Sequence, residues 1–183
     1  MRLYVLVFLS LLMLAGNCEP ETPEIPNEEE VITTLIYTLT SDPDNSVTTL
    51  TFRDLDGDGG NAPVITGATL AASTTYSAEL TLQNEQEEPA EDITEEIEEE
   101  DEDHQFFFES TVPGLAVAYN DSDGAGNPVG LRTTLTTGDA GSGTLTITLR
   151  HEPSKSAAGV SDGSLDNAGG ETDIEVTFDL IIQ

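Results

Sequence analysis

The side chains of this sequence best suited to holding a metal ion are its two histidines. His104 follows six consecutive acidic residues and opens an alternating apolar stretch, whereas His151 closes another such stretch. If the two stretches form antiparallel strands, both rings lie at one end of the domain. The carboxylates of Glu98, Glu102 and Glu152 then complete a predicted site for Zn²⁺ or a similar divalent ion. Solvated rim histidines are the alternative, because no fixed metal-binding spacing is present.

A second candidate cation site is the loop at residues 54–61 (DLDGDGGN). The carboxylates of Asp54, Asp56 and Asp58 stand at alternate positions before glycines, which lets a turn fold its oxygen atoms around Ca²⁺. The loop is not an EF-hand, because Ile65 occupies the position of that motif's bidentate glutamate. A structural Ca²⁺ site and a metal-free acidic turn are both open readings of this loop.

The sequence offers little that is typical of an enzyme. It contains neither a Gly-x-Ser-x-Gly motif nor a phosphate-binding loop, and its one cysteine, Cys18, stands at the end of a leader. The carboxylates are so numerous that no single pair indicates a general acid and base. We therefore predict a protein that is not an enzyme, with a hydrolase as the weaker alternative.

The charge balance excludes one class of partner. The 183 residues include 36 Asp and Glu against 5 Lys and Arg, for a formal net charge of -31. Such a polyanion is repelled by phosphate backbones, so nucleic-acid binding is excluded. We expect bound cations to offset part of this charge in the native state, and the length suits a single modest domain.

The first 17 residues have the features of a signal peptide. Arg2 precedes an apolar run at residues 3–14, which is too short for a stable membrane span, and small residues follow. The placement of Cys18 resembles a bacterial lipoprotein signal, although Asn17 is inserted before the cysteine. This resemblance implies that Cys18 is lipidated and becomes the first residue of the mature protein. Ordinary secretion is the alternative.

An acidic, proline-rich tether is predicted at residues 18–30. After Cys18 it holds three Pro and six Glu, a composition that cannot bury much apolar surface and favours an extended chain. Acidic residues directly after a lipid-bearing cysteine resemble the Bacteroidota signal for the outer face of the outer membrane. That resemblance implies an outer-membrane lipoprotein at the cell surface, and the periplasmic face is the alternative.

Residues 31–183 are predicted to form one all-β domain. Apolar and polar residues alternate with period two in several stretches, the pattern of strands with one buried face. Those stretches cover residues 35–39, 50–52, 76–83, 104–110, 115–120, 129–137, 144–150 and 173–182. Strands of this number and spacing predict an immunoglobulin-like β-sandwich of about 7–8 strands.

One acidic segment interrupts the strand pattern. Ile93 and Ile97 are four residues apart within residues 89–103, among good helix formers. We expect a short acidic helix across one end of the sandwich. Beyond Ile97 the carboxylates repel one another, so this part should be weakly stable unless a cation compensates.

Two resemblances extend this reading. Residues 70–76 (LAASTTY) resemble the Leu-x-Pro-x-Thr-x-Tyr corner of fibronectin type III domains, with Ala72 in place of the proline. In that corner the hydroxyl of the tyrosine, here Tyr76, bonds back to the backbone where the chain crosses between sheets. Longer stretches resemble a family of small flavobacterial lipoproteins commonly labelled "type 1 periplasmic binding fold superfamily protein". They are residues 27–34 (NEEEVITT), 54–59 (DLDGDG), 89–97 (PAEDITEEI), 104–108 (HQFFF) and 168–174 (AGGETDI).

The family resemblance implies an envelope lipoprotein, whereas its label implies two α/β lobes that the strand pattern here does not predict. The predicted function is a membrane-anchored, non-catalytic module that binds Zn²⁺ or Ca²⁺ and serves an outer-membrane partner such as a transporter. An adhesion or glycan-binding surface module is the alternative.

Overall fold

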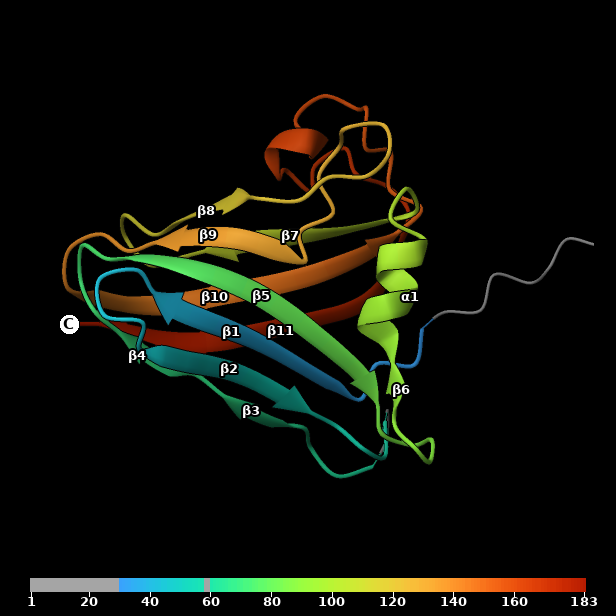
Figure 1. Ribbon diagram of the computed structural model, residues 1–183, viewed down its shortest axis with the longest axis horizontal. Helices are drawn as coiled ribbons and strands as arrows, with labels where there is room; N and C mark the ends of the chain where they lie inside the picture. Colours follow the sequence, from blue (N-terminus) through green and yellow to red (C-terminus); the bar gives the residue numbers. More distant parts are fainter. Residues whose placement is uncertain (1–29, 58–59) are drawn as a thin grey trace, which may run out of the picture.

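The chain folds as two β-sheets packed face to face, with one short α-helix at the end of the sandwich (Figure 1). The computed structural model describes residues 30–57 and 60–183. The signal peptide, Cys18 and nearly all of the predicted tether therefore lie outside the described residues. The prediction of an all-β sandwich is confirmed.

The larger sheet has the strand order β3-β2-β1-β5-β9-β8, and β6 pairs with the end of β5. All of its pairings are antiparallel. Its strands are β1 (Thr34–Ser41), β2 (Val47–Arg53), β3 (Val64–Thr66), β5 (Thr75–Asn84), β6 (Glu91–Asp92), β8 (Ala116–Tyr119) and β9 (Arg132–Thr136).

The smaller sheet has the order β4-β11-β10-β7. Its strands are β4 (Ala68–Leu70), β11 (Glu171–Ile182), β10 (Gly141–His151) and β7 (His104–Ser110). The pairing of β4 with β11 is parallel, whereas β10 pairs antiparallel with both β11 and β7. β10 pairs with β11 along its whole length, and residues 152–170 separate the two strands in the chain.

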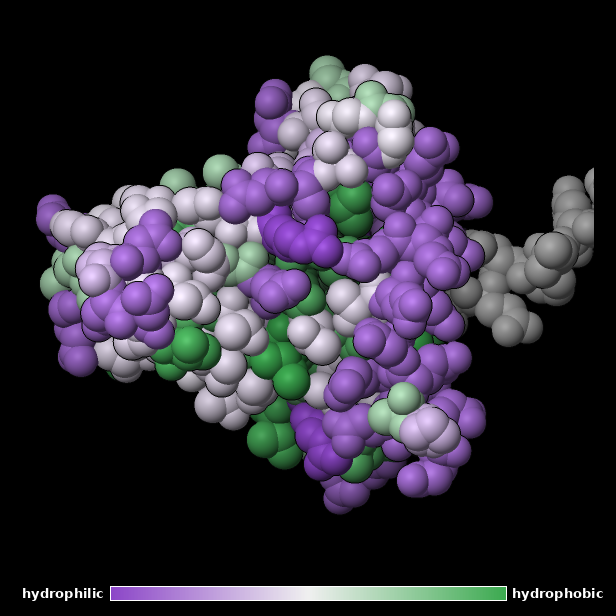
Figure 2. Space-filling view, in the orientation of Figure 1, coloured by the Kyte–Doolittle hydropathy of each residue, from purple (hydrophilic) through white to green (hydrophobic). Residues whose placement is uncertain are grey.

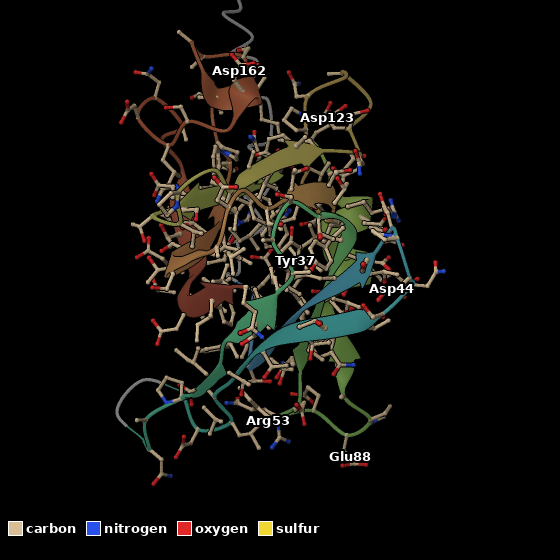
Figure 3. The ribbon with its side chains drawn as sticks, turned by 90° about the vertical axis from the view of Figure 1, so that its left-hand side faces the viewer. Tyr37, Asp44, Arg53, Glu88, Asp123 and Asp162 are labelled. Atoms are coloured by element: carbon tan, nitrogen blue, oxygen red, sulfur yellow. The ribbon has the colours of Figure 1, made fainter. Side chains whose placement is uncertain are left out.

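The core lies between the sheets and follows the period-two alternation. Leu35, Tyr37 and Leu39 of β1 are fully buried, as are Leu145 and Ile147 of β10. Tyr37 lies in the middle of the sandwich (Figure 3), where its hydroxyl lies 2.6 Å from that of Thr133 on β9. All eight predicted strands are present. The additional strands β3, β4 and β6 have two or three residues each, too few for an alternation to reveal them.

The predicted acidic helix is also present, as α1 (Ile93–Glu99). Asp92 caps its N-terminus by accepting a hydrogen bond from the Thr94 amide at 3.1 Å. Ile93 and Ile97 are buried, and the Thr94 hydroxyl bonds the backbone of Leu82 on β5. The helix therefore closes the end of the sandwich where β5 and β10 finish and β7 begins (Figure 1). Within the described residues, no helix has the length and apolar character to span a bilayer.

A long loop covers the outer face of the smaller sheet. It includes the short 3₁₀-helix η1 (Val160–Asp162), and Val160 packs with Phe107 of β7 in a small second apolar cluster. The loop is held by a buried ion pair, in which the Nζ atom of Lys155 lies 3.1 Å from an Asp123 carboxylate oxygen. Asp123 and Asp162 both lie in loops on the same side of the sandwich (Figure 3).

The chain crosses from the smaller to the larger sheet between β4 and β5, at the tyrosine corner predicted from the sequence. There the Ala71 amide donates a hydrogen bond to the Tyr76 hydroxyl oxygen at 2.8 Å. This bond holds the crossing against the strand that follows it.

We expect Tyr76→Phe to lower the free energy of unfolding by about 1 kcal/mol, because it leaves the partly buried Ala71 amide without this acceptor. Urea denaturation followed by circular dichroism measures the change. An unaltered denaturation midpoint would show that the corner hydrogen bond does not stabilise the fold.

Candidate metal centre

Four side chains at the helix-covered end of the sandwich form a compact group of potential metal ligands. Glu30, His104, His151 and Asp173 each offer one ligand atom, and these atoms all lie within 4.8 Å of one another. Glu30 precedes β1, and the other three belong to β7, β10 and β11. The group therefore joins the N-terminal segment to three adjoining strands of the smaller sheet.

The two imidazoles meet because of the antiparallel register of β7 and β10. His104 and His151 are directly opposite each other in that register. Their rings are stacked, with centroids 4.5 Å apart and planes inclined by 29°. His104 alternates in phase with the buried Phe106, and His151 with the buried Leu149, so both rings point into the interior. The side chain of His104 is 0% exposed and that of His151 is 5% exposed. The predicted convergence of the two histidines at one end is confirmed.

A β-bulge brings the Asp173 carboxylate into this group. Leu149 pairs with Ile174 but the next residue, Arg150, pairs with Thr172, so Asp173 is the additional residue in β11. Strict alternation would place Asp173 on the outer face with Glu175. The bulge instead re-aims its side chain, which is fully buried, with one oxygen 3.9 Å from the Nδ1 atom of His151.

Glu30 reaches the histidines from the N-terminal side of β1. Its Oε1 atom lies 2.8 Å from the Nε2 atom of His104, and its Oε2 atom lies 3.8 Å from the Nδ1 atom of His151. The side chain is 7% exposed. Within the described residues, Oε2 is buried and has no hydrogen-bond partner, so this oxygen can accept a ligand.

The Nδ1 atom of His104 holds the ring with its Nε2 atom toward Glu30. Nδ1 lies 3.1 Å from the backbone carbonyl oxygen of Glu100, just beyond α1. A carbonyl oxygen only accepts hydrogen bonds, so Nδ1 carries the proton and the lone pair of a neutral His104 is on Nε2, toward Glu30. Metal-binding histidines commonly have such a carbonyl partner, which holds the ring in position.

Electrostatics couples Glu30 to His104 in the metal-free protein. Burial acts to lower the pKa of His104, but contact with Glu30 and the charges of Glu30 and Asp173 outweigh it, and the pKa lies above 6.5. Burial acts to raise the pKa of Glu30, yet the histidine contacts bring it below 4.5. The two groups therefore form an ion pair when no metal is bound. A divalent cation would displace the imidazole proton and neutralise both buried carboxylates of the group.

The three carboxylates predicted to accompany the histidines, Glu98, Glu102 and Glu152, lie outside this four-residue group. Glu98 on α1 forms an ion pair with Arg132, and Glu102 and Glu152 are exposed. Their places near the histidines are taken by Glu30, expected in the tether, and by Asp173, expected on the outer face. A buried acidic residue just before the first strand has no sequence signal, and the bulge that turns Asp173 inward has none either.

In the loop at residues 54–61 the described carboxylates bond to their own turn. Asp54 accepts from the Gly57 amide at 3.0 Å, and Asp56 accepts from the backbone and side-chain nitrogens of Asn61 at 3.0 and 2.7 Å. Asp58 lies outside the described residues. The Ca²⁺ site of this loop stays a prediction.

Comparison with protein-family models, curated proteins and solved structures finds no match to this chain. Its function must therefore be inferred from the geometry and chemistry of the site.

The Glu30–His104 pair predicts a pH dependence for the metal-free protein. The raised pKa of His104 gives a stabilisation that is complete below pH 6.5 and is lost as pH rises through the folded-state value. The lowered pKa of Glu30 gives a second stabilisation of the folded state. It is present above pH 4.5 and is lost as pH falls through the folded-state pKa of Glu30.

With chelator present, Glu30→Gln should therefore lower the melting temperature most between pH 4.5 and 6.5, and less as pH rises above 6.5 through the folded-state pKa of His104. Differential scanning fluorimetry across this range measures the effect. Exposed Glu102→Gln is the control and should change the melting temperature little at any pH. A loss that is the same at every pH would contradict the ion pair.

Proposed function

We propose that this protein is a membrane-anchored lipoprotein of the bacterial cell envelope whose β-sandwich binds one divalent metal ion. The metal ligands are Glu30, His104, His151 and Asp173. The observation that carries this proposal is the convergence of four buried ligand atoms within 4.8 Å, two of them imidazole nitrogens. Buried carboxylates are costly unless they are paired or bind a metal, and this centre contains two of them.

The donor set favours Zn²⁺ over Ca²⁺. Two nitrogen and two oxygen ligands suit the tetrahedral coordination of Zn²⁺, whereas Ca²⁺ takes six to eight oxygen ligands. Other first-row divalent ions that accept imidazole, such as Co²⁺ and Ni²⁺, should bind the same ligands. Cellular metal availability then decides which ion fills the site.

The metal has a structural rather than a catalytic role in this proposal. Four protein ligands fill a tetrahedral shell, whereas a catalytic zinc site keeps one position for water or substrate. The bound ion would fasten the N-terminal segment, through Glu30, to strands β7, β10 and β11. This role agrees with the expectation that the protein is not an enzyme.

The envelope location follows from the lipoprotein resemblance at Cys18. Glu30 is the twelfth residue after Cys18 in the sequence, so an extended tether would span at most about 40 Å. The metal centre would then lie at the membrane-proximal end of the domain. There the protein could present its metal-dependent end to an outer-membrane partner.

The glycan-binding alternative has less support. A glycan platform would expose aromatic rings, but each of the eight aromatic residues in the described part of the chain is buried or half-buried. Four of these rings are fully buried, namely Tyr37, Phe106, Phe107 and Phe178.

The proposal predicts saturable metal binding that stabilises the fold. Isothermal titration with Zn²⁺ should give one site per chain. At a free Zn²⁺ concentration of about 100 times Kd, the unfolding free energy should rise by about 2.7 kcal/mol, or roughly 5–10 °C in melting temperature. Identical melting curves with Zn²⁺ and with chelator would contradict the proposal.

Ligand substitutions give the matched test. Asp173→Asn and His151→Gln should each weaken Zn²⁺ binding by more than about tenfold, since even the loss of a residue behind a metal ligand weakens binding by that factor. Glu102→Gln removes an acidic charge near His104 in sequence but outside the ligand group, and it should bind like the wild type.

Lipid attachment is testable separately. Cys18→Ser should abolish incorporation of a labelled fatty acid and release the protein from the membrane fraction of an expressing bacterium. Labelling that persists in the variant would exclude lipidation at Cys18. This result would leave the metal-binding proposal unaffected.

A further inference from the structure

A groove lined by acidic side chains opens beside the metal centre. We call it the acidic groove and define it by the residues Glu30, Asn84, Glu91, Glu96, Glu99 and Glu100. It lies between α1 and the end of β5, where hydrophilic side chains gather on the surface (Figure 2). Val31 and Ile93 also line it, so five of its eight described lining residues carry carboxylates, and none of the eight is a Lys or an Arg.

The inner end of the acidic groove is a residue of the metal centre itself. Glu30 lines the groove and also belongs to the four-residue ligand group. Its side chain is more than nine-tenths buried, and its Oε2 atom has no hydrogen-bond partner among residues 30–57 and 60–183. The acidic groove therefore adjoins an oxygen atom that is placed to accept a cation.

The outer part of the acidic groove holds carboxylates close together. Glu91 and Glu96 line the same part of the groove, near enough for the charge of Glu91 to act on Glu96, and Asn84 donates to Glu91 at 3.3 Å. Burial and the charges of Glu91 and Glu30 raise the pKa of Glu96. Two carboxylates this close repel each other unless a proton or a cation lies between them.

The positive side chains near this end are engaged elsewhere. Arg132 pairs with Glu98, on the other side of α1 from the groove, and Arg53 pairs with Glu85. Among the described residues, no Lys or Arg cancels the negative potential of the acidic groove, and only its innermost carboxylate, Glu30, is paired, with His104. A concave surface lined by one sign of charge concentrates counterions and speeds their association.

We propose that the acidic groove is the route by which a divalent cation reaches the buried metal centre. Glu91 and Glu96 bind the hydrated ion transiently, and Glu30 transfers it to the histidines. This inference rests on the proposed metal-binding function and adds to it the path of loading. It explains why Glu30 lines the acidic groove and the ligand group at once.

The test compares association rates in two charge-matched variants of the full-length protein. The groove variant is Glu91→Gln, Glu96→Gln and Glu99→Gln, and these exposed substitutions preserve side-chain shape. The control removes the same charge from the outer face of the smaller sheet. Its substitutions are Glu109→Gln, Glu175→Gln and Asp179→Asn. Stopped-flow absorbance with Co²⁺ measures the association and dissociation rate constants.

At low ionic strength the groove variant should bind Co²⁺ about tenfold more slowly than the wild type, while the control changes by less than about twofold. The difference should shrink in about 0.5 M salt, because screening weakens the groove potential. Both variants should still reach one Co²⁺ per chain. Equal rates for the groove variant and the control would overturn the loading route and leave the metal site intact. Absence of Co²⁺ binding by the wild type would overturn the proposed function itself.

Discussion

Burial of two carboxylates and two imidazoles in one small space is the constraint on which this end of the molecule depends. Desolvating these charges opposes folding, and only attraction within the group can offset it. In the metal-free protein the Glu30–His104 contact supplies part of that attraction. A divalent cation would supply more, since it is attracted to both carboxylates and to the two ring nitrogens at once. The four side chains at the sandwich end therefore form a group that could hold a metal ion.

The same centre gives the N-terminal segment a structural role. Glu30 precedes the first strand, yet its side chain is as buried as those of the core. Since β7, β10 and β11 supply the other three groups, the centre joins the beginning of the domain to segments more than seventy residues later in the chain. Burial of the Glu30 side chain thus fixes the start of the described chain against the sandwich.

The acidic and basic side chains of the protein are distributed unevenly over the structure. The acidic residues of α1 and its flanks lie over the metal centre, on the hydrophilic end of the surface (Figure 2). The four basic residues in the described part of the chain are held in place, for example Lys155 by Asp123 and Arg53 by Glu85. Negative potential is therefore concentrated where a cation would bind.

Much of the architecture was predictable because it depends on local patterns. Period-two alternation located eight strands, the spacing of Ile93 and Ile97 located α1, and the parity of His104 and His151 placed both rings inward at one end. The carboxylate ligands were not predictable. Asp173 turns inward at a bulge that exists only because β10 and β11 pair with a one-residue offset. Glu30 is buried only in the folded sandwich, where it lies beside α1 and contacts His104 of β7. Residue types and periodicity determined the layers of this protein, whereas long-range strand register decided which charges meet, because register is a property of pairing between distant segments.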